Sequence, residues 1–279
     1  VLQSMKKTAY LGILCLLASF RTEEAWPLYR HIDHASFDVG ECLTYRVHYG
    51  WFNAGLATMR IDEQLHEVNG RPCYKIDVAG ESKGLLYLFL KMKNHFGSYL
   101  DTAALVSQRF YRYIQEGKYR KNERINFDHA QKLAIVERLD EHTRELRDTA
   151  AFSVTDNIQD IVSSWYALRT LDFSQAQAGD VFSTPVFFDD ILYEEFKVRF
   201  LRKQALKTKR GTFNALVLAP VVPFAANGNS IFAGENSVEL FLSDDSNKVP
   251  LKIKCKLLVG AVEIDLIKYQ GLKNDLPKR

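Results

Sequence analysis

One pentapeptide in the sequence has the spacing that some hydrolases use to present a serine nucleophile. Gly80-Glu81-Ser82-Lys83-Gly84 fits the GxSxG pattern, in which a serine on a sharp strand-to-helix turn gives its proton to a histidine. The neighbouring segments are predicted hairpins rather than a parallel sheet, and the last histidine of the chain is His142. The sequence therefore leaves enzymatic activity open but favours its absence, and it indicates no catalytic residue.

A metal site is the second chemistry that the residue types suggest. His31-Ile32-Asp33-His34 places two imidazoles three residues apart with a carboxylate between them, which is part of a ligand set. A firmly bound transition metal needs further ligands on a rigid scaffold, and the sequence has no HExxH motif. We predict solvated polar side chains here, with no metal and no cofactor.

Two pairs of adjacent acids, Asp189-Asp190 and Asp244-Asp245, have the residue type that glycosidases use. Glycoside hydrolysis requires two carboxylates that face each other across the scissile bond, whereas adjacent residues of a strand point to opposite faces. We therefore predict that both pairs are turn residues.

The overall charge gives no sign of a nucleic-acid partner. The 279 residues include 37 Lys and Arg against 34 Asp and Glu, and 47% of them are apolar. Proteins that track phosphates carry a much larger positive excess, so we predict no binding of nucleic acid. The apolar fraction is sufficient for a large core.

The N-terminal region has the order of a secretory signal peptide. A positive start, Met5-Lys6-Lys7, precedes an uncharged apolar run over 8–20, and charges resume at Arg21. The run is shorter than the ~20 residues that span a bilayer. Cys15 follows Leu14, where a lipoprotein signal has a small residue, so lipid attachment is not favoured.

These features predict an exported protein. We expect a signal peptide over 1–20, of which 1–4 are non-native, with cleavage after Ala18 or Ser19, then a flexible segment over 21–35. A single β domain over 36–270 and a tail over 271–279 complete the chain. The mature protein is expected in the periplasm or at the periplasmic face of the outer membrane, without a transmembrane segment.

Alternating apolar and polar residues predict the elements that must position any site. Leu43 to Tyr49 has the two-residue period of a half-buried strand, and Asn69-Gly70 is typical of a two-residue hairpin turn. Similar segments continue along the chain, interrupted by one helical pattern at about 156–170, for which Thr155 or Asp156 can act as cap. We predict a mainly β fold, a large curled antiparallel sheet or open barrel with this helix on its concave side.

Several segments resemble one protein family over about residues 36–268. They are Phe37 to Tyr45, Tyr49 to Ala57, the helix start at Asp156, and the stretch from Gly234 to Pro250. The chain resembles DUF3108, a family of exported bacterial proteins of unknown function. The resemblance implies a curved sheet like that of LolA and LolB lipoprotein carriers, which wrap around helices and hold acyl chains. It implies no activity.

The predicted function is that of a non-enzymatic envelope protein whose apolar groove binds a lipid, a lipopeptide or another hydrophobic ligand. A groove for about ten carbons would suffice, because each buried CH₂ contributes about 0.8 kcal/mol. The alternatives are a structural protein with a filled core that binds an envelope partner and, third, an esterase-like hydrolase using Ser82. The sequence allows one disulfide, between Cys42 and Cys73, without deciding whether it forms. The candidate groove residues are Tyr45, Tyr49, Trp51, Tyr74, Leu85, Leu86, Phe89, Trp165 and Phe196.

Overall fold

One antiparallel sheet of fourteen strands dominates the computed structural model, which describes residues 29–84, 87, 91–221 and 236–279. The expected signal peptide over 1–20 lies outside the described residues. The first eight strands are β1 (Cys42–Tyr49), β2 (Phe52–Val68), β3 (Arg71–Ser82), β4 (Met92–Asp101), β5 (Ser107–Glu116), β6 (Tyr119–Asp128), β7 (Leu133–Leu139) and β8 (Leu146–Ser153). After the helix α3 (Ser163–Arg169) follow β9 (Val181–Phe188), β10 (Ile191–Thr208), β11 (Gly211–Pro220), β12 (Val238–Ser243), β13 (Pro250–Lys256) and β14 (Ala261–Gln270). The prediction of a mainly β fold is confirmed.

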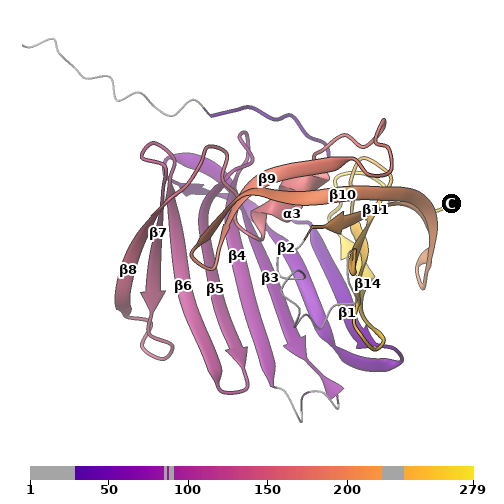
Figure 1. Ribbon diagram of the computed structural model, residues 1–279, viewed down its shortest axis with the longest axis horizontal. Coiled ribbons are helices and arrows are strands. Elements are labelled where there is room, and N and C mark those ends of the chain that lie inside the picture. The colour runs from indigo at the N-terminus through magenta and orange to yellow at the C-terminus, as the bar shows by residue number, and fades with distance from the viewer. Residues whose placement is uncertain (1–28, 85–86, 88–90, 222–235) are drawn as a thin grey trace, which may run out of the picture.

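The strand order shows that two meanders share one sheet. It runs β8-β7-β6-β5-β4-β3-β2-β1-β14-β13-β12-β11-β10-β9, so the meanders join where β1 pairs with β14. Residues far apart in the chain thereby become neighbours, such as Cys42 and Gln270. The sheet ends at β8 and β9, and no ladder between described residues joins these edges. Figure 1 shows the curled sheet, with β9 and β10 passing across the top close to α3.

The turn residues behave as their chemistry predicts. Asn69 and Gly70 have φ angles of 53° and 69° and connect β2 to β3, which confirms the predicted hairpin. Asp189 and Asp190 also have positive φ, 52° and 62°, between β9 and β10. The pair Asp244-Asp245 lies in the bend between β12 and β13. Both acid pairs are therefore turn residues, as predicted.

The helix is shorter than the sequence pattern predicts. Expected over about 156–170, it covers only Ser163–Arg169. Asn157 has a φ of 58°, a left-handed conformation that a right-handed helix does not contain. The N-cap position is Val162 rather than Thr155 or Asp156, and the side chain that binds N–H groups at the helix start is that of Asp160, two residues earlier. Its carboxylate accepts the backbone N–H groups of Val162 and Ser163 at 2.6 and 2.8 Å, and its own N–H donates to Ser163 Oγ at 2.8 Å.

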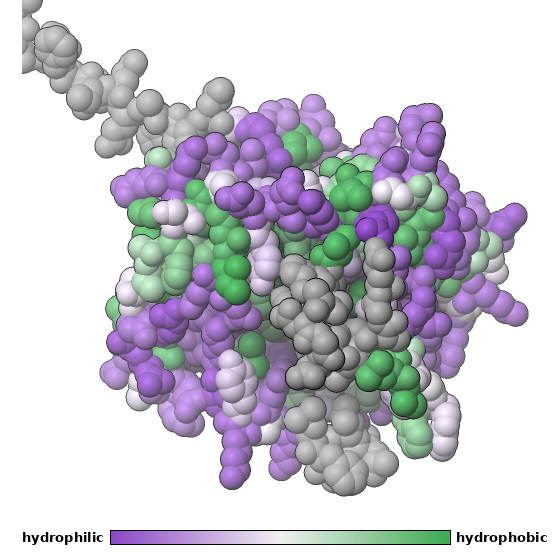
Figure 2. All heavy atoms as spheres, in the orientation of Figure 1, coloured by the Kyte–Doolittle hydropathy of each residue, from purple (hydrophilic) through white to green (hydrophobic). Residues whose placement is uncertain are grey.

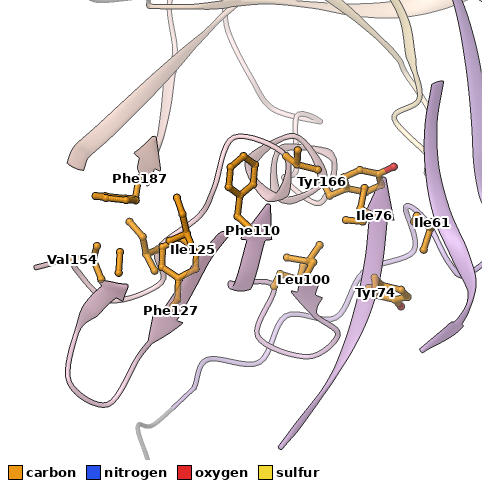
Figure 3. Close-up of a cluster of buried hydrophobic side chains, with 14 of the residues drawn as sticks. Ile61, Tyr74, Ile76, Leu100, Phe110, Ile125, Phe127, Val154, Tyr166 and Phe187 are labelled. Atoms are coloured by element: carbon orange, nitrogen blue, oxygen red, sulfur yellow. The ribbon is translucent and has the colours of Figure 1, made fainter. Parts of the chain in front are cut away.

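Three clusters of buried side chains fill most of the interior. The largest lies over β2 to β7, and Figure 3 shows Phe110, Ile125 and Phe127 of this cluster with Tyr166 of α3 nearby. A second cluster joins β1 to β10, β11 and β14, and a third joins α3 to β10, β11 and β12. Because side chains of the chain itself occupy this space, any ligand is restricted to what the clusters leave free.

A buried ion pair connects the end of α3 to the segment before β1, and further hydrogen bonds connect it to the segment after β14. The guanidinium of Arg169 is 1% exposed and donates to both carboxylate oxygens of Glu41, at 2.6 and 2.7 Å. It also donates to the carbonyl oxygens of Ser36, at 3.0 Å, and Asn247, at 3.1 Å. Asn247 in turn binds the backbone of Asn274, in the segment that follows β14. The helix is therefore held by segments that are more than 200 residues apart in sequence.

The cysteines do not form the bridge that the sequence left open. Cys42, Cys73 and Cys255 are free thiols. Burial raises the pKa of Cys73 to about 12, which disfavours the reactive thiolate. These thiols act as small apolar side chains of the sheet.

Candidate functional site

An apolar cavity of about 170 Å³ lies between α3 and the strands β9 and β10. Two of the predicted groove residues, Trp165 on α3 and Phe196 on β10, line it together. The remaining lining residues come from the same elements, from the N-terminal segment before β1, from the residues next to the helix, and from β11 and β12. They are Arg30, Ile32, Ile161, Ser164, Ala167, Leu168, Thr170, Leu171, Phe182, Ser183, Thr184, Val198, Pro220 and Leu240.

The walls of the cavity are fixed by backbone pairing. Phe196 pairs with Thr184, and Val198 pairs with Phe182, so one stretch of the β9–β10 ladder supplies these four lining residues and Ser183 between them. The segment before α3 is attached to β9, because Gln159 accepts the Phe187 N–H at 2.8 Å and donates its own N–H to the Pro185 carbonyl at 3.0 Å. The cap formed by Asp160 sets the start of the helix.

The described lining of the cavity is mostly apolar. Its described lining residues include no His, Cys, Asp or Glu. Ser164 Oγ donates to the Ile161 carbonyl at 3.0 Å, and Thr170 Oγ1 donates to the Ala167 carbonyl at 2.8 Å. These hydroxyl groups are thus occupied by the helix backbone, and aliphatic and aromatic carbon forms most of the wall.

The other four described candidates do not line this cavity. Tyr45 and Tyr74 are buried in the packed clusters, so they are part of the core. Tyr49 and Trp51 lie at the β1–β2 turn, where 38% and 87% of these residues are exposed. The remaining three candidates, Leu85, Leu86 and Phe89, lie outside the described residues.

Ser82 occupies a different setting from that of a hydrolase nucleophile. It is the last residue of β3, in an antiparallel ladder with β2 and β4, and it is 4% exposed. Its Oγ accepts the Met92 N–H at 3.0 Å. The imidazole of His95, which pairs with Ala79 of β3, binds Asp77 at 2.7 Å, and Tyr111 also donates to this carboxylate. The GxSxG chemistry uses a strand-to-helix turn on a parallel sheet, whereas β3 pairs antiparallel with both of its neighbours.

The two N-terminal histidines do not face a common point. His31 Nε2 lies 3.0 Å from the exposed Asp33 carboxylate. His34 packs on Phe37 with ring centroids 4.3 Å apart, and burial lowers its pKa to about 4. The rings therefore have separate environments, one solvated and one packed.

A cluster of His48, Glu263 and Asp265 escaped the sequence analysis because β1 and β14 are far apart in the chain. Their ligand atoms lie within 4.8 Å of one another, the spacing of a metal site. Lys252 Nζ lies 2.8 Å from Glu263 and 3.3 Å from Asp265, so both carboxylates already have an ammonium as ion-pair partner. Burial alone would raise the pKa of Asp265, but the hydrogen bond from His48 and the charge of Lys252 lower it. The cluster is an ion-pair network across three strands.

In the described residues, no helix combines the length and apolarity needed to cross a bilayer. The solved structures that resemble this fold include a β-barrel-like DUF1849 protein from Brucella abortus, with a TM-score of 0.50 and 10% identity over 84% of this chain and 98% of that one. This similarity shows the fold alone.

Two further similar structures have lower scores. A "putative lipoprotein" from Parabacteroides distasonis has a TM-score of 0.33 and 8% identity, covering 86% of this chain and 100% of that one. A "putative exported protein" with a YmcC-like fold from Bacteroides fragilis has 0.31 and 12%, covering 87% and 99%. A comparison with curated proteins gave no match. The family model described as protein of unknown function DUF3108 matches residues 44–267, and the chain belongs to this family.

Proposed function

We propose that this protein is an exported, non-enzymatic envelope protein that binds an apolar ligand, such as the end of a lipid acyl chain, in the cavity beside α3. The observation that carries the proposal is the cavity itself. It leaves about 170 Å³ free between Trp165 and Phe196, and most of its lining is apolar. The signal-peptide pattern at the N-terminus supports export.

The size of the cavity limits what it can hold. A dry apolar cavity of about 150 Å³ in another protein binds benzene, so this one has room for about six carbons. At about 0.8 kcal/mol per buried CH₂, six carbons contribute about 5 kcal/mol, which corresponds to dissociation constants of about 0.1–1 mM. The site therefore suits the end of a chain, shorter than the ten carbons that the sequence suggested.

A cavity-filling variant tests the proposal. Ala167 lines the cavity from α3, so Ala167→Leu adds three carbons to the space that the ligand would take. We expect calorimetry with 1-octanol to show saturable binding to the wild type and at least tenfold weaker binding to this variant, with thermal stability maintained. The matched control is Ala130→Leu at an exposed turn, which should bind as the wild type does. Absence of binding to the wild type, or equal binding to Ala167→Leu, would contradict the proposal.

A second candidate function is docking at a lipid surface, and the end of the sheet near the β1–β2 and β13–β14 turns favours it. Trp51, Leu258 and Val259 are 87%, 75% and 78% exposed. The two turns are adjacent because β1 pairs with β14, and Tyr49 Oη donates to the Val259 carbonyl at 2.9 Å. Figure 2 shows hydrophobic side chains gathered at the lower right of the molecule, where these strands end.

The form of this surface suits a bilayer better than a protein. Its apolar groups protrude from two short turns, whereas a stable protein interface buries about 800 Å² on each partner. Tryptophan and aliphatic side chains at such points insert into the headgroup region of a membrane. We expect the wild type to sediment with vesicles of phosphatidylethanolamine and phosphatidylglycerol, and the variant Trp51→Ser with Val259→Ser to stay in the supernatant. Equal sedimentation of both would refute this function.

A further inference from the structure

Arg30 places a positive charge at the edge of the apolar cavity. Arg30 is one of the residues that line the cavity, as are Ile32 and Trp165. It is held in place by two hydrogen bonds, from Nε to the Ala104 carbonyl at 2.9 Å and from Nη2 to the Leu105 carbonyl at 3.1 Å. The Ile32 N–H donates to the Ala103 carbonyl at 2.9 Å, so the backbone around Arg30 is anchored as well.

The guanidinium of Arg30 has no carboxylate partner among the described residues. Its hydrogen bonds there go to neutral carbonyl groups. It is partly withdrawn from water, and burial lowers its pKa without an opposing contribution from an acid. Arginine nevertheless stays protonated at neutral pH because its usual pKa is above 12. A half-buried charge without a counter-charge favours the binding of an anion.

One basic residue at each of two other cavities, Arg138 and Lys252, differs from Arg30 in this respect. Arg138 lines a polar cavity and lies 2.8 Å from the Asp148 carboxylate. Lys252 lines another and lies 3.3 Å from the Asp265 carboxylate. Each of these two charges has a carboxylate partner, whereas the guanidinium of Arg30 has none among the described residues.

We infer that the cavity takes a single-chain amphiphile with an anionic head, whose alkyl end lies between Trp165 and Phe196 and whose head pairs with Arg30. The inference rests on the proposed function and names the class of ligand. A guanidinium presents N–H groups in a planar fork that matches both carboxylates and phosphates. The shared chemistry is therefore an alkyl chain that ends in an oxyanion.

Calorimetry with ligands of equal chain length tests the inference. We expect octanoate or octyl phosphate to bind the purified protein at least tenfold more tightly than 1-octanol, and octylamine to bind more weakly than 1-octanol. The tighter of the two anions identifies the head. Acetate and inorganic phosphate, which lack the chain, should not bind at the same concentrations.

Substitution of Arg30 separates charge from packing. Arg30→Gln should weaken the binding of the preferred anion at least tenfold and change that of 1-octanol less than twofold, whereas Arg30→Lys should keep part of the preference. Arg147→Gln removes the same charge from an exposed position of β8 and should have no effect. Thermal unfolding of each variant checks the fold, and the 1-octanol arm shows that the cavity is intact.

The outcomes distinguish the two proposals. If 1-octanol binds as tightly as both anions, or if Arg30→Gln leaves the preference unchanged, the inference is wrong while the proposed function stands. If none of the eight-carbon ligands binds the wild type, both are wrong.

Discussion

Loss of the Glu41 charge should unfold this protein more readily than loss of an acid at the surface. Glu41 and Arg169 are both about 0–1% exposed at their side chains, and two short hydrogen bonds join them. Burial would lower the pKa of Arg169, but the nearby charge of Glu41 raises it. In Glu41→Gln the guanidinium therefore stays charged and buried, without its counter-charge.

The size of the expected loss in stability follows from the hydrogen bonds that a glutamine at position 41 can still make. Glutamine has one acceptor oxygen in place of two, so at least one charge-assisted hydrogen bond of about 1.5–3 kcal/mol is lost. The amide nitrogen also faces the donors of Arg169. Removing one partner of a buried pair costs about 3–5 kcal/mol, and we expect the free energy of unfolding to fall by this amount.

Urea denaturation followed by circular dichroism measures the effect. The matched control is Glu63→Gln, because Glu63 pairs with Arg60 at 3.1 Å with both side chains more than half exposed. The control should cost about 0–1 kcal/mol. If Glu41→Gln costs no more than Glu63→Gln, the ion pair does not hold the helix in place and our reasoning about α3 fails.

Three further predictions concern other carboxylates. Burial would raise the pKa of Asp101, but hydrogen bonds from Arg71 and from the backbone lower it below its usual 3.8. The contribution of Asp101 to the free energy of unfolding is therefore complete above pH 3.8 and is lost as the pH falls through the lower native pKa. Asp101→Asn should make the free energy of unfolding, measured in urea titrations, depend less on pH in the acid range. Asp160→Ala removes the helix cap and should lower the free energy of unfolding by about 2 kcal/mol or more, which thermal denaturation can check. Asp189→Asn with Asp190→Gly keeps a favourable turn sequence but removes the ion pairs of this turn to Arg112, Lys121 and Arg138. Amide hydrogen exchange around 186–192 should therefore accelerate. Unchanged exchange would show that these ion pairs do not stabilise the β9–β10 hairpin.

Local sequence patterns predicted the strands and turns well because their causes are local. The alternation from Leu43 to Tyr49 reflects a half-buried surface, and the burial of Leu43 and Tyr45 follows it. The turns at Asn69-Gly70 and Asp189-Asp190 follow from residues that tolerate positive φ. The helix was predicted too long because Asn157 is left-handed and because the Asp160 cap depends on tertiary contacts.

The site could be predicted only in part because distant segments build it. Alternation identifies which face of a strand is inward, but it cannot distinguish a packed residue such as Tyr45 from a cavity-lining residue such as Phe196. Arg30 is positioned by hydrogen bonds from its guanidinium to the carbonyl groups of Ala104 and Leu105, which lie more than 70 positions later in the sequence. Sequence alone carries no local signal for such a contact.

The claim that the cavity beside α3 binds an alkyl chain is tested most directly by crystallography with 8-bromo-1-octanol. We predict an anomalous bromine signal between Trp165 and Phe196 in the wild type, and its loss from this position in Ala167→Leu. Bromine found only on the outer surface of the wild type, with the cavity empty at saturating ligand, would contradict the account.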